Sequence, residues 1–419
     1  SSDPKTFLNA TMHQGLVAIV LSAWAVSALA QVDPRDQWCS YRIPAGFVYE
    51  GESLTLEQAR ALPPPRAVLT LLNVKEITPE VAGIIVNPHM QTFLTLPAVH
   101  MVDVATAEAL SRQRGHLRLW GIETLAPDVA EALTKSPGQS LELTGVRDIS
   151  PEVARALAHG KRGQLVLGLT SLSTEIAEIL AEFKGDLEFP RLETLSLESA
   201  KAIAEHGEVV QRGSETFGPW LDLGKARLTP AVAEALLAHD GALSVGGLEK
   251  LEPGVGDILA KHRFEVNLML DEIDSAPLAR KLFSGPRGSA SVCCLLTMSP
   301  EIAAEYAQRD PGYLERLDTL SAEAARELAK GDLPITLPAV TKISPELATA
   351  LTDRVRPVYL SGIKALDGPD AVAVAEALAS TRGPIWMDSL ERVSAPALAA
   401  LRKKDTIRLP PEEELTIVP

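Results

Sequence analysis

Aromatic residues and cysteine are scarce in this sequence. Phe, Trp and Tyr make up only 4% of the 419 residues, so the core has to be built from small aliphatic side chains packed at short range. The three cysteines, Cys39, Cys293 and Cys294, are too few for a disulfide framework. We interpret the adjacent pair Cys293 and Cys294 as two small apolar residues of a strand rather than as a redox or metal site.

Basic residues are also fewer than acidic residues in this sequence. The chain has 40 Lys and Arg residues against 55 Asp and Glu residues, which gives a formal net charge of −15 at pH 7. No stripe of Lys and Arg interrupts this excess. Because an acidic surface repels phosphate groups, we expect neither nucleic acid nor an anionic membrane surface as a partner.

Recognisable catalytic, cofactor-binding and metal-binding patterns are missing too. The chain has no H-E-x-x-H, G-x-S-x-G or phosphate-loop motif and no dinucleotide fingerprint between a strand and a helix. Four histidines, His159, His206, His239 and His262, recur at the ends of expected helices, where we expect them to be exposed and favoured by the free carbonyl groups. We therefore predict a protein that is not an enzyme and uses no cofactor or metal. An enzyme with residues scattered over one face is the weaker alternative.

The one long apolar run lies near the N-terminus. Residues 15–30 contain no charge and end in Ala28-Leu29-Ala30, a small-x-small cleavage motif, before Pro34 breaks any helix. We interpret residues 1–30 as a signal peptide cleaved after Ala30, with an uncleaved anchor as the alternative. Both interpretations place the remaining chain outside the cytoplasm, secreted or in the periplasm or cell envelope. We expect no membrane span in the mature chain.

A repeat of 22 to 25 residues dominates the rest of the chain. The segments 117–133 and 141–157 match at almost every apolar position. Thirty prolines and 28 glycines recur at regular intervals, which indicates many short elements. The aliphatic residue that precedes each expected helix sets the register: Leu54, Ile77, Val102, Leu125, Ile149, Leu172, Leu195, Leu228, Leu251, Ile273, Met298, Leu320, Ile343, Leu366 and Val393.

Each repeat predicts one short strand and one short helix. Leu141 and Leu143 alternate with polar residues, as in a half-buried strand. The segment 150–152 reads Ser-Pro-Glu, a helix start with an N-cap, a proline in the first turn and a favourable negative charge. Val153 and Leu157 then share one helical face. Stacking such units predicts an α/β fold, a curved strand–helix solenoid with a parallel sheet on the concave face and short helices on the convex face.

These repeats resemble the leucine-rich-repeat superfamily, in particular secreted bacterial variants whose units read L-x-L-x-G, two spaced aliphatic residues, and then Ser/Thr-Pro-Glu. The resemblance covers residues 54–404, about fourteen or fifteen repeats. The register lacks the asparagine that is common in the family. We expect residues 31–53 to form an N-terminal cap and residues 405–419 a C-terminal cap strand and tail. The resemblance implies that the concave sheet face binds a protein or another macromolecule.

Aromatic and polar residues that point outward from the strands are the candidate contacts. Tyr359 and Trp386 occupy the same column of adjacent strands, about 5 Å apart, with Ser361 and Asp388 in the next column. The insertion within residues 196–227 adds further aromatics. Packing of these aromatics against neighbouring loops is the alternative at each site. The candidate partner-binding residues are: Trp120, Arg118, Tyr359, Ser361, Trp386, Asp388, Phe217 and Trp220.

The sequence therefore predicts an extracytoplasmic, non-catalytic binding module for a protein or other macromolecule. A structural component of the cell envelope that associates with copies of itself is the alternative. The sequence does not name the ligand.

Overall fold

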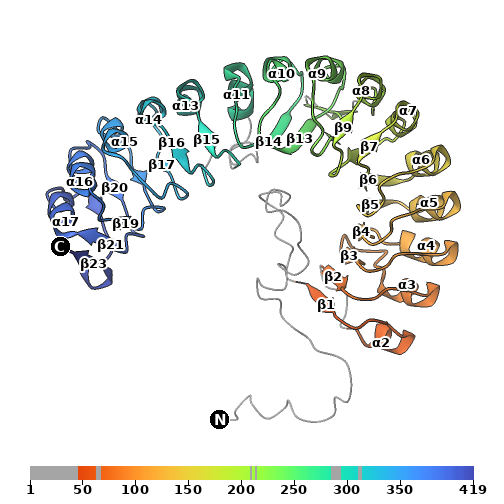
Figure 1. Cartoon of the computed structure of the whole chain (residues 1–419). Coiled ribbons are helices and arrows are strands. Elements are labelled where there is room, and N and C mark those ends of the chain that lie inside the picture. Colours follow the sequence, from red (N-terminus) through yellow and green to blue (C-terminus); the bar gives the residue numbers. More distant parts are fainter. Residues whose placement is uncertain (1–45, 63–67, 208–209, 213–214, 285–293, 310–313) are drawn as a thin grey trace, which may run out of the picture. The chain divides into compact units, whose positions relative to one another are not determined.

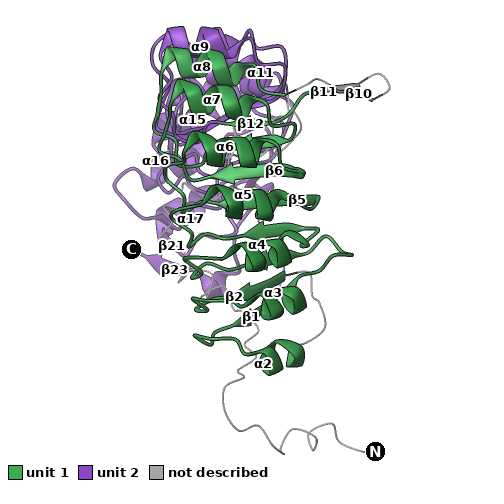
Figure 2. Cartoon of the chain, turned by 90° about the vertical axis from the view of Figure 1, so that its right-hand side faces the viewer, with its two compact units in different colours: residues 1–37, 41–222 green, residues 38–40, 223–419 purple. Residues whose placement is uncertain are grey.

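The computed structural model describes residues 46–62, 68–207, 210–212, 215–284, 294–309 and 314–419. The predicted signal peptide and most of the predicted N-terminal cap lie outside these residues. The described chain divides into two compact units, with unit 1 ending at Asp222 and unit 2 beginning at Leu223. Figure 2 colours the two units separately.

Unit 1 is a stack of strand–helix repeats. Its main sheet runs in the order β1-β2-β3-β4-β5-β6-β8-β12, and its neighbouring strands are parallel. The strands are β1 (Phe47–Tyr49), β2 (Val68–Leu71), β3 (Phe93–Thr95), β4 (His116–Arg118), β5 (Gly138–Leu143), β6 (Arg162–Leu167), β8 (Asp186–Glu188) and β12 (Leu221–Asp222). A second small parallel pair is formed by β7 (Ser171–Leu172) and β9 (Thr194–Leu195).

The helices of unit 1 alternate with these strands and lie on one side of them (Figure 1). They are α2 (Leu56–Ala61), α3 (Pro79–Ile85), α4 (Val104–Ser111), α5 (Pro127–Thr134), α6 (Pro151–Ala158), α7 (Thr174–Ala181) and α8 (Leu197–Ala204). We call the opposite side of the sheet the sheet face of the unit. This alternation confirms the predicted α/β strand–helix solenoid.

Unit 2 repeats the pattern, and most of its strands are only two or three residues long. Its helices are α9 (Pro230–Leu236), α10 (Val255–Leu259), α11 (Ala276–Phe283), α13 (Pro300–Ala307), α14 (Ala322–Ala329), α15 (Pro345–Ala350), α16 (Ala371–Ala379) and α17 (Ala395–Leu401). Parallel pairs join β13 (Leu243–Leu248) to β14 (Val266–Leu270), and β15 (Thr297–Met298) to β16 (Thr319–Leu320). Two further parallel sheets follow. One contains β17 (Ile335–Thr336), β18 (Val358–Tyr359), β20 (Ile385–Trp386) and β22 (Ile407–Arg408). The other contains β19 (Ala365–Leu366), β21 (Arg392–Ser394) and β23 (Thr416–Val418).

The predicted helix starts are confirmed in detail. Ser150 accepts a hydrogen bond from the backbone N–H of Val153 and caps α6, with proline in the first turn. Thr78, Ser299 and Ser344 cap α3, α13 and α15 in the same way. Each such cap satisfies one of the backbone donors that an isolated helix end leaves free, at about 1 kcal/mol per helix.

The core is aliphatic, as the composition predicts. Leu141, Leu143 and Leu157 are completely buried, and the same positions are buried in the neighbouring repeats. A single repeat buries too little apolar surface to fold alone, so stability comes from stacking one repeat on the next.

A glycine follows the strand in many repeats, where the chain turns out of the sheet. Gly145 lies in such a turn and Gly224 has a φ of 55°, whereas Gly145 and Gly168 are not among the glycines with positive φ. A Cβ atom at Gly145 would lie 2.3 Å from the carbonyl oxygen of Trp120, and one at Gly168 would lie 2.0 Å from that of Thr144. Glycine is required there because the backbones of successive repeats approach so closely.

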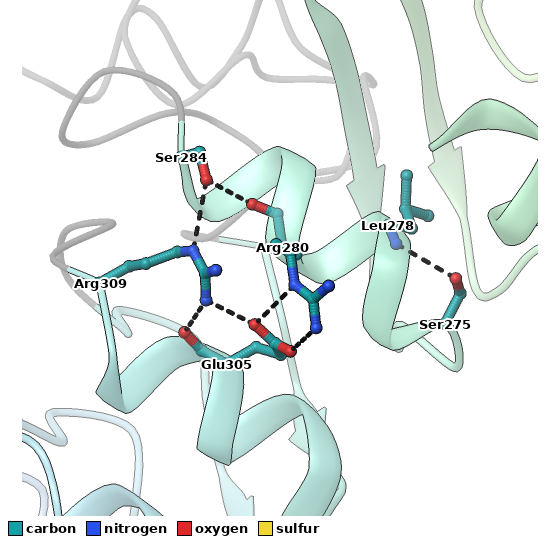
Figure 3. A network of polar contacts seen from close by, with 6 residues as sticks. All are labelled: Ser275, Leu278, Arg280, Ser284, Glu305 and Arg309. Carbon is teal, nitrogen blue, oxygen red and sulfur yellow. Dashed lines mark hydrogen bonds and ion pairs between the residues drawn. The ribbon is translucent and has the colours of Figure 1, made fainter. Parts of the chain in front are cut away.

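Ion pairs join the neighbouring helices α11 and α13 of unit 2 (Figure 3). The carboxylate of Glu305 on α13 accepts hydrogen bonds from Arg280 on α11 at 2.6 Å and from Arg309 at 2.5 Å. Arg309 also donates to the hydroxyl of Ser284 at 3.3 Å. These arginines lower the pKa of Glu305, through the hydrogen bond from Arg280 above all. The network therefore stabilises the stacking of α11 on α13.

Three histidines differ from the expectation of exposure. His159 is exposed, but His206, His239 and His262 are only 1–2% exposed. His159 is the C-cap of α6, whereas His206 lies one residue beyond the C-cap of α8, and its N–H bonds to the carbonyl of Ile203. Burial also lowers the pKa of His262.

The C-terminal segment contains a short helix and a paired strand. Within the expected C-terminal cap and tail, three exposed glutamates form a short 3₁₀ helix, η2 (Glu412–Glu414), and Arg402 donates a hydrogen bond to Glu412. Strand β23 then pairs in parallel with β21. Within the described ranges no helix is long and apolar enough to cross a membrane.

Candidate partner-binding surface

Two of the predicted aromatic contacts lie side by side on the sheet face of unit 2. Parallel pairing of β18 with β20 sets Tyr359 opposite Trp386. Their ring centroids are 4.8 Å apart, and the ring planes are tilted by 55°. Both residues are half-buried, so each keeps part of its ring open to solvent. The predicted adjacency of these two side chains is confirmed.

Charged residues border this aromatic pair. Arg408 follows Trp386 in the same column, and its guanidinium carbon lies 4.8 Å from the centroid of the Trp386 ring. Its Nε atom lies 3.2 Å from a carboxylate oxygen of Asp388. Ser361 is half-buried two residues after Tyr359. Arg408 is a member of this surface that the sequence interpretation missed, although its place in the column could have been read from the next repeat.

A second cluster lies on the sheet face of unit 1, around Arg118. The register of β3, β4 and β5 sets Arg118 between Thr95 and Glu142. The Nε atom of Arg118 donates to Glu142 Oε1 at 2.9 Å, and Trp120 Nε1 donates to Glu142 Oε2 at 3.3 Å. The guanidinium carbon of Arg118 is 4.8 Å from the centroid of the Phe93 ring and 5.7 Å from that of the Trp120 ring.

His116 extends this cluster along the sheet. Its ring stacks on Phe93, with centroids 4.1 Å apart and planes within 1° of parallel, and its Nδ1 atom lies 2.8 Å from the hydroxyl of Ser140. Burial and the neighbouring charge of Arg118 lower the pKa of His116 to about 4, so this ring is neutral at pH 7. Phe93, His116 and Glu142 were missed as site residues because each strand taken alone shows only an ordinary alternation.

Carboxylates gather at the other end of the unit 1 sheet face. Glu188 lies opposite Asp222 in the register of β8 and β12 and accepts a hydrogen bond from Gln164 at 2.5 Å. Burial raises the pKa of Glu188 to about 7, with further increases from the charges of Asp222, Glu142 and Asp186. Glu188 is therefore only partly ionised at neutral pH. Burial also raises the pKa of Asp186, whose carboxylate accepts the backbone N–H of Trp220 at 2.8 Å.

The insertion forms a β-hairpin with its own two strands. Strands β10 (Val210–Arg212) and β11 (Glu215–Phe217) pair antiparallel, with Val210 opposite Phe217. The hairpin projects away from the stack of repeats in unit 1 (Figure 2). Trp220, which follows it, is half-buried and is held at its backbone by Asp186.

The predicted contacts thus fall into separate groups. Arg118 and Trp120 meet in unit 1, Phe217 and Trp220 belong to the insertion of unit 1, and Tyr359, Ser361, Trp386 and Asp388 lie together in unit 2.

Of the three cysteines, only Cys294 lies within the described residues. It is buried, as expected of a small apolar residue, but it lies in a turn before β15 rather than in a strand. In the parts of the chain that the structure describes, no group of three His, Cys, Asp or Glu side chains is arranged to hold a metal ion.

Comparisons with known proteins give only a distant likeness. No protein-family model and no curated protein sequence matches the chain. A leucine-rich-repeat protein of Leptospira interrogans matches at 15% identity, covering 84% of this chain and 89% of that one, with a TM-score of 0.34. An internalin of Listeria monocytogenes matches at 13% identity, covering 87% of this chain and 89% of its own, with a TM-score of 0.31.

A chain of the Drosophila Toll–Spatzle complex matches at 15% identity, covering 82% of this chain and 43% of that one, with a TM-score of 0.34. With TM-scores this low, the assignment of a leucine-rich-repeat-like solenoid rests on the parallel strands and alternating helices of this chain itself.

Proposed function

We propose that this protein is a non-catalytic binding module that recognises another protein through its sheet face, with Tyr359 and Trp386 as the central contacts. The observation that supports this most is the exposed part of the two adjacent rings, bordered by Arg408 and Asp388. Tyr, Trp and Arg are the residues that most often dominate protein interfaces. A scarcity of aromatics elsewhere in the chain makes their pairing here more notable.

Such a contact would gain free energy from the burial of two rings whose positions are already fixed. Strand pairing and the neighbouring ring restrict the rotamers of Tyr359 and Trp386 before any partner arrives, so little side-chain entropy is lost on binding. The partner would exclude water from the rings, and Arg408 and Asp388 would remain at the rim, where charges contribute mainly to specificity.

Replacing both rings tests this proposal. We expect the variant with Tyr359→Ala and Trp386→Ala to bind its partner at least about 30-fold more weakly, the loss of about 2 kcal/mol that a single buried anchor would cause. The partner is first captured from cell-surface extracts by the unaltered protein and then purified, and its dissociation constant is measured by calorimetry.

The matched control replaces Glu323 and Arg326 with alanine. This exposed pair lies on the helix side of the same unit, with a nitrogen-to-oxygen distance of 3.7 Å. Equal weakening by the two double variants, or weakening by the control alone, would rule out the sheet face as the binding surface. Capture of nothing but further copies of the chain would favour the structural, self-associating alternative.

We also propose that the chain is exported and that its mature form begins at Gln31. The support is the uncharged segment 15–30 and its Ala-Leu-Ala ending. Mass spectrometry of the N-terminal peptide from the native protein checks this. Recovery of an intact segment 15–30 from a membrane fraction would instead indicate an anchor.

A further inference from the structure

Contacts on the sheet face fix the guanidinium group of Arg118 in place but leave some of its hydrogen-bond donors available. Glu142 binds only the Nε atom. The aromatic rings of Phe93 and Trp120 lie 4.8 and 5.7 Å from the guanidinium carbon. The Arg118 side chain is only 12% exposed. An arginine with this much contact has lost most of its rotamer freedom before any ligand binds.

The terminal nitrogens of Arg118 remain available. Within the described part of the chain, no side chain or backbone group accepts a hydrogen bond from Nη1 or Nη2. Neither atom is among the buried nitrogens that lack a partner, so both reach solvent. The second oxygen of Glu142 accepts instead from the indole of Trp120 at 3.3 Å. Arg118 therefore presents a planar pair of donors at a fixed place on the sheet.

The chemistry of these donors selects the ligand. Two parallel N–H donors match the two oxygens of a carboxylate, and such bidentate pairs are among the stronger hydrogen-bonded contacts in proteins. The formal charges of Arg118 and Glu142 cancel, and His116 is neutral. A ligand of high negative charge, such as a phosphate or a run of acidic residues, would be repelled by Glu142 and by the net charge of −15. A single carboxylate next to apolar atoms fits best, since Phe93 and Trp120 offer apolar surface beside the guanidinium.

We propose that Arg118 is a recognition site for one carboxylate side chain of the protein partner, an Asp or Glu flanked by apolar residues. This inference rests on the proposed binding function and concerns a contact of unit 1 alone. Glu142 acts as a positioning residue that orients the guanidinium and moderates its charge, and Phe93 and Trp120 support it.

Selection of peptides from a displayed random library tests the site without a known partner. Peptides are selected on the unaltered protein and counter-selected on the Arg118→Lys variant, which keeps the charge but loses the planar pair of donors. We expect the surviving peptides to contain one Asp or Glu beside apolar residues. Calorimetry with synthetic peptides is expected to show at least about tenfold weaker binding to Arg118→Lys, and a similar loss when the peptide acid is replaced by its amide.

The control is Arg147→Lys, because Arg147 is an exposed arginine of the same unit, and this variant is expected to bind the peptides normally. A library that yields no peptide dependent on Arg118, or peptides without an acidic residue, would overturn the proposal. So would equal losses with Arg147→Lys.

A second variant separates recognition from a purely structural role of Arg118. Glu142→Gln has a single amide oxygen, which can still accept the hydrogen bond from Arg118 Nε and so keep the guanidinium in place, but it loses the weaker bond from Trp120 and the negative charge that faces the ligand. We expect this variant to bind the acidic peptides several-fold more tightly, and unchanged or weaker binding would contradict the proposal. Failure of these peptide tests leaves the Tyr359 and Trp386 experiment untouched, because that experiment measures contacts of unit 2 with the natural partner.

Discussion

Replacing Arg162 with methionine is expected to destabilise unit 1 by about 4 kcal/mol, a large fraction of the stability of a typical domain. Arg162 begins strand β6 and is only 4% exposed. Its Nη1 atom donates to the carbonyl oxygen of Gln113 at 2.8 Å, and its Nη2 atom donates to those of Ser111 at 2.9 Å and Leu133 at 3.3 Å. Methionine fills much of the same space but leaves these three carbonyl groups without a donor.

The physical reason for the size of this effect is the position of the carbonyl groups. Ser111 and Leu133 belong to the last turns of α4 and α5, where the backbone oxygens have no partner inside the helix and carry the negative end of the helix dipole. One guanidinium group thus joins three successive repeats. Burial lowers the pKa of Arg162 to about 10, so the side chain still carries its charge at pH 7.

The absence of a side chain at Gly138 belongs to the same arrangement. Gly138 pairs with Arg162 in the sheet, and a Cβ atom there would lie 1.9 Å from Nη1 of Arg162. The missing side chain at Gly138 therefore leaves the space that the guanidinium group of Arg162 occupies.

Hydrogen exchange measured by mass spectrometry is the suitable test, because two compact units need not unfold in one step. We expect faster exchange in α4, α5, β5 and β6 of the Arg162→Met variant, with exchange in unit 2 unchanged. Arg147→Met, at an exposed site, is expected to change stability by no more than about 0.5 kcal/mol. Unaltered protection of β5 and β6 in Arg162→Met would show that the three carbonyl contacts contribute little.

The contribution of Arg162 also shows where prediction from the sequence stops. The strand alternation of Leu141 and Leu143 and the capped start of α6 depend on neighbours in the chain, so the sequence predicts them well. The contact of Arg162 with Ser111 spans 51 residues. Nothing in one repeat distinguishes this arginine from a surface residue, since its partners are backbone groups that any sequence supplies.

The same limit applies to the candidate site. The adjacency of Tyr359 and Trp386 follows from the repeat register alone, because each occupies the same column of adjacent strands. The joint use of Glu142 by Arg118 and Trp120 depends on side-chain rotamers, which the register does not determine. His206 lies one residue beyond the C-cap of α8 and is buried, and periodicity does not define helix ends to within one residue.

Replacing Glu188 with glutamine is expected to stabilise unit 1 at neutral and alkaline pH and to leave it unchanged in acid. The pKa of Glu188 is raised from its usual value of 4.5 to about 7, first by burial and then by the charge of Asp222. A raised pKa means that the folded state disfavours the ionised form, so ionisation costs stability. This cost is absent below about pH 4.5, grows as the pH rises from about 4.5 to about 7, and then levels off at about 3 kcal/mol.

Glutamine removes this cost while keeping an oxygen that can accept the hydrogen bond from Gln164. The unfolding free energies of the two proteins should therefore agree at pH 4 and diverge in favour of Glu188→Gln by about 3 kcal/mol at pH 8. The difference between the two proteins isolates Glu188 from other titrating groups, apart from Asp222, Glu142 and Asp186, whose ionisation it also eases. Urea unfolding followed by hydrogen exchange in β8 and β12 measures the effect.

Glu178→Gln supplies the control for this experiment, because Glu178 is an exposed glutamate of α7 in the same unit. We expect its stability to follow that of the unaltered protein at both pH values, within about 0.5 kcal/mol. A gain at pH 8 that is equal in the two variants would indicate a general effect of the net charge of −15. A gain in unfolding free energy at pH 8 that is confined to Glu188→Gln would show that the cost comes from the buried carboxylate facing Asp222. If Glu188→Gln shows no gain at pH 8, Glu188 ionises without penalty on the sheet face.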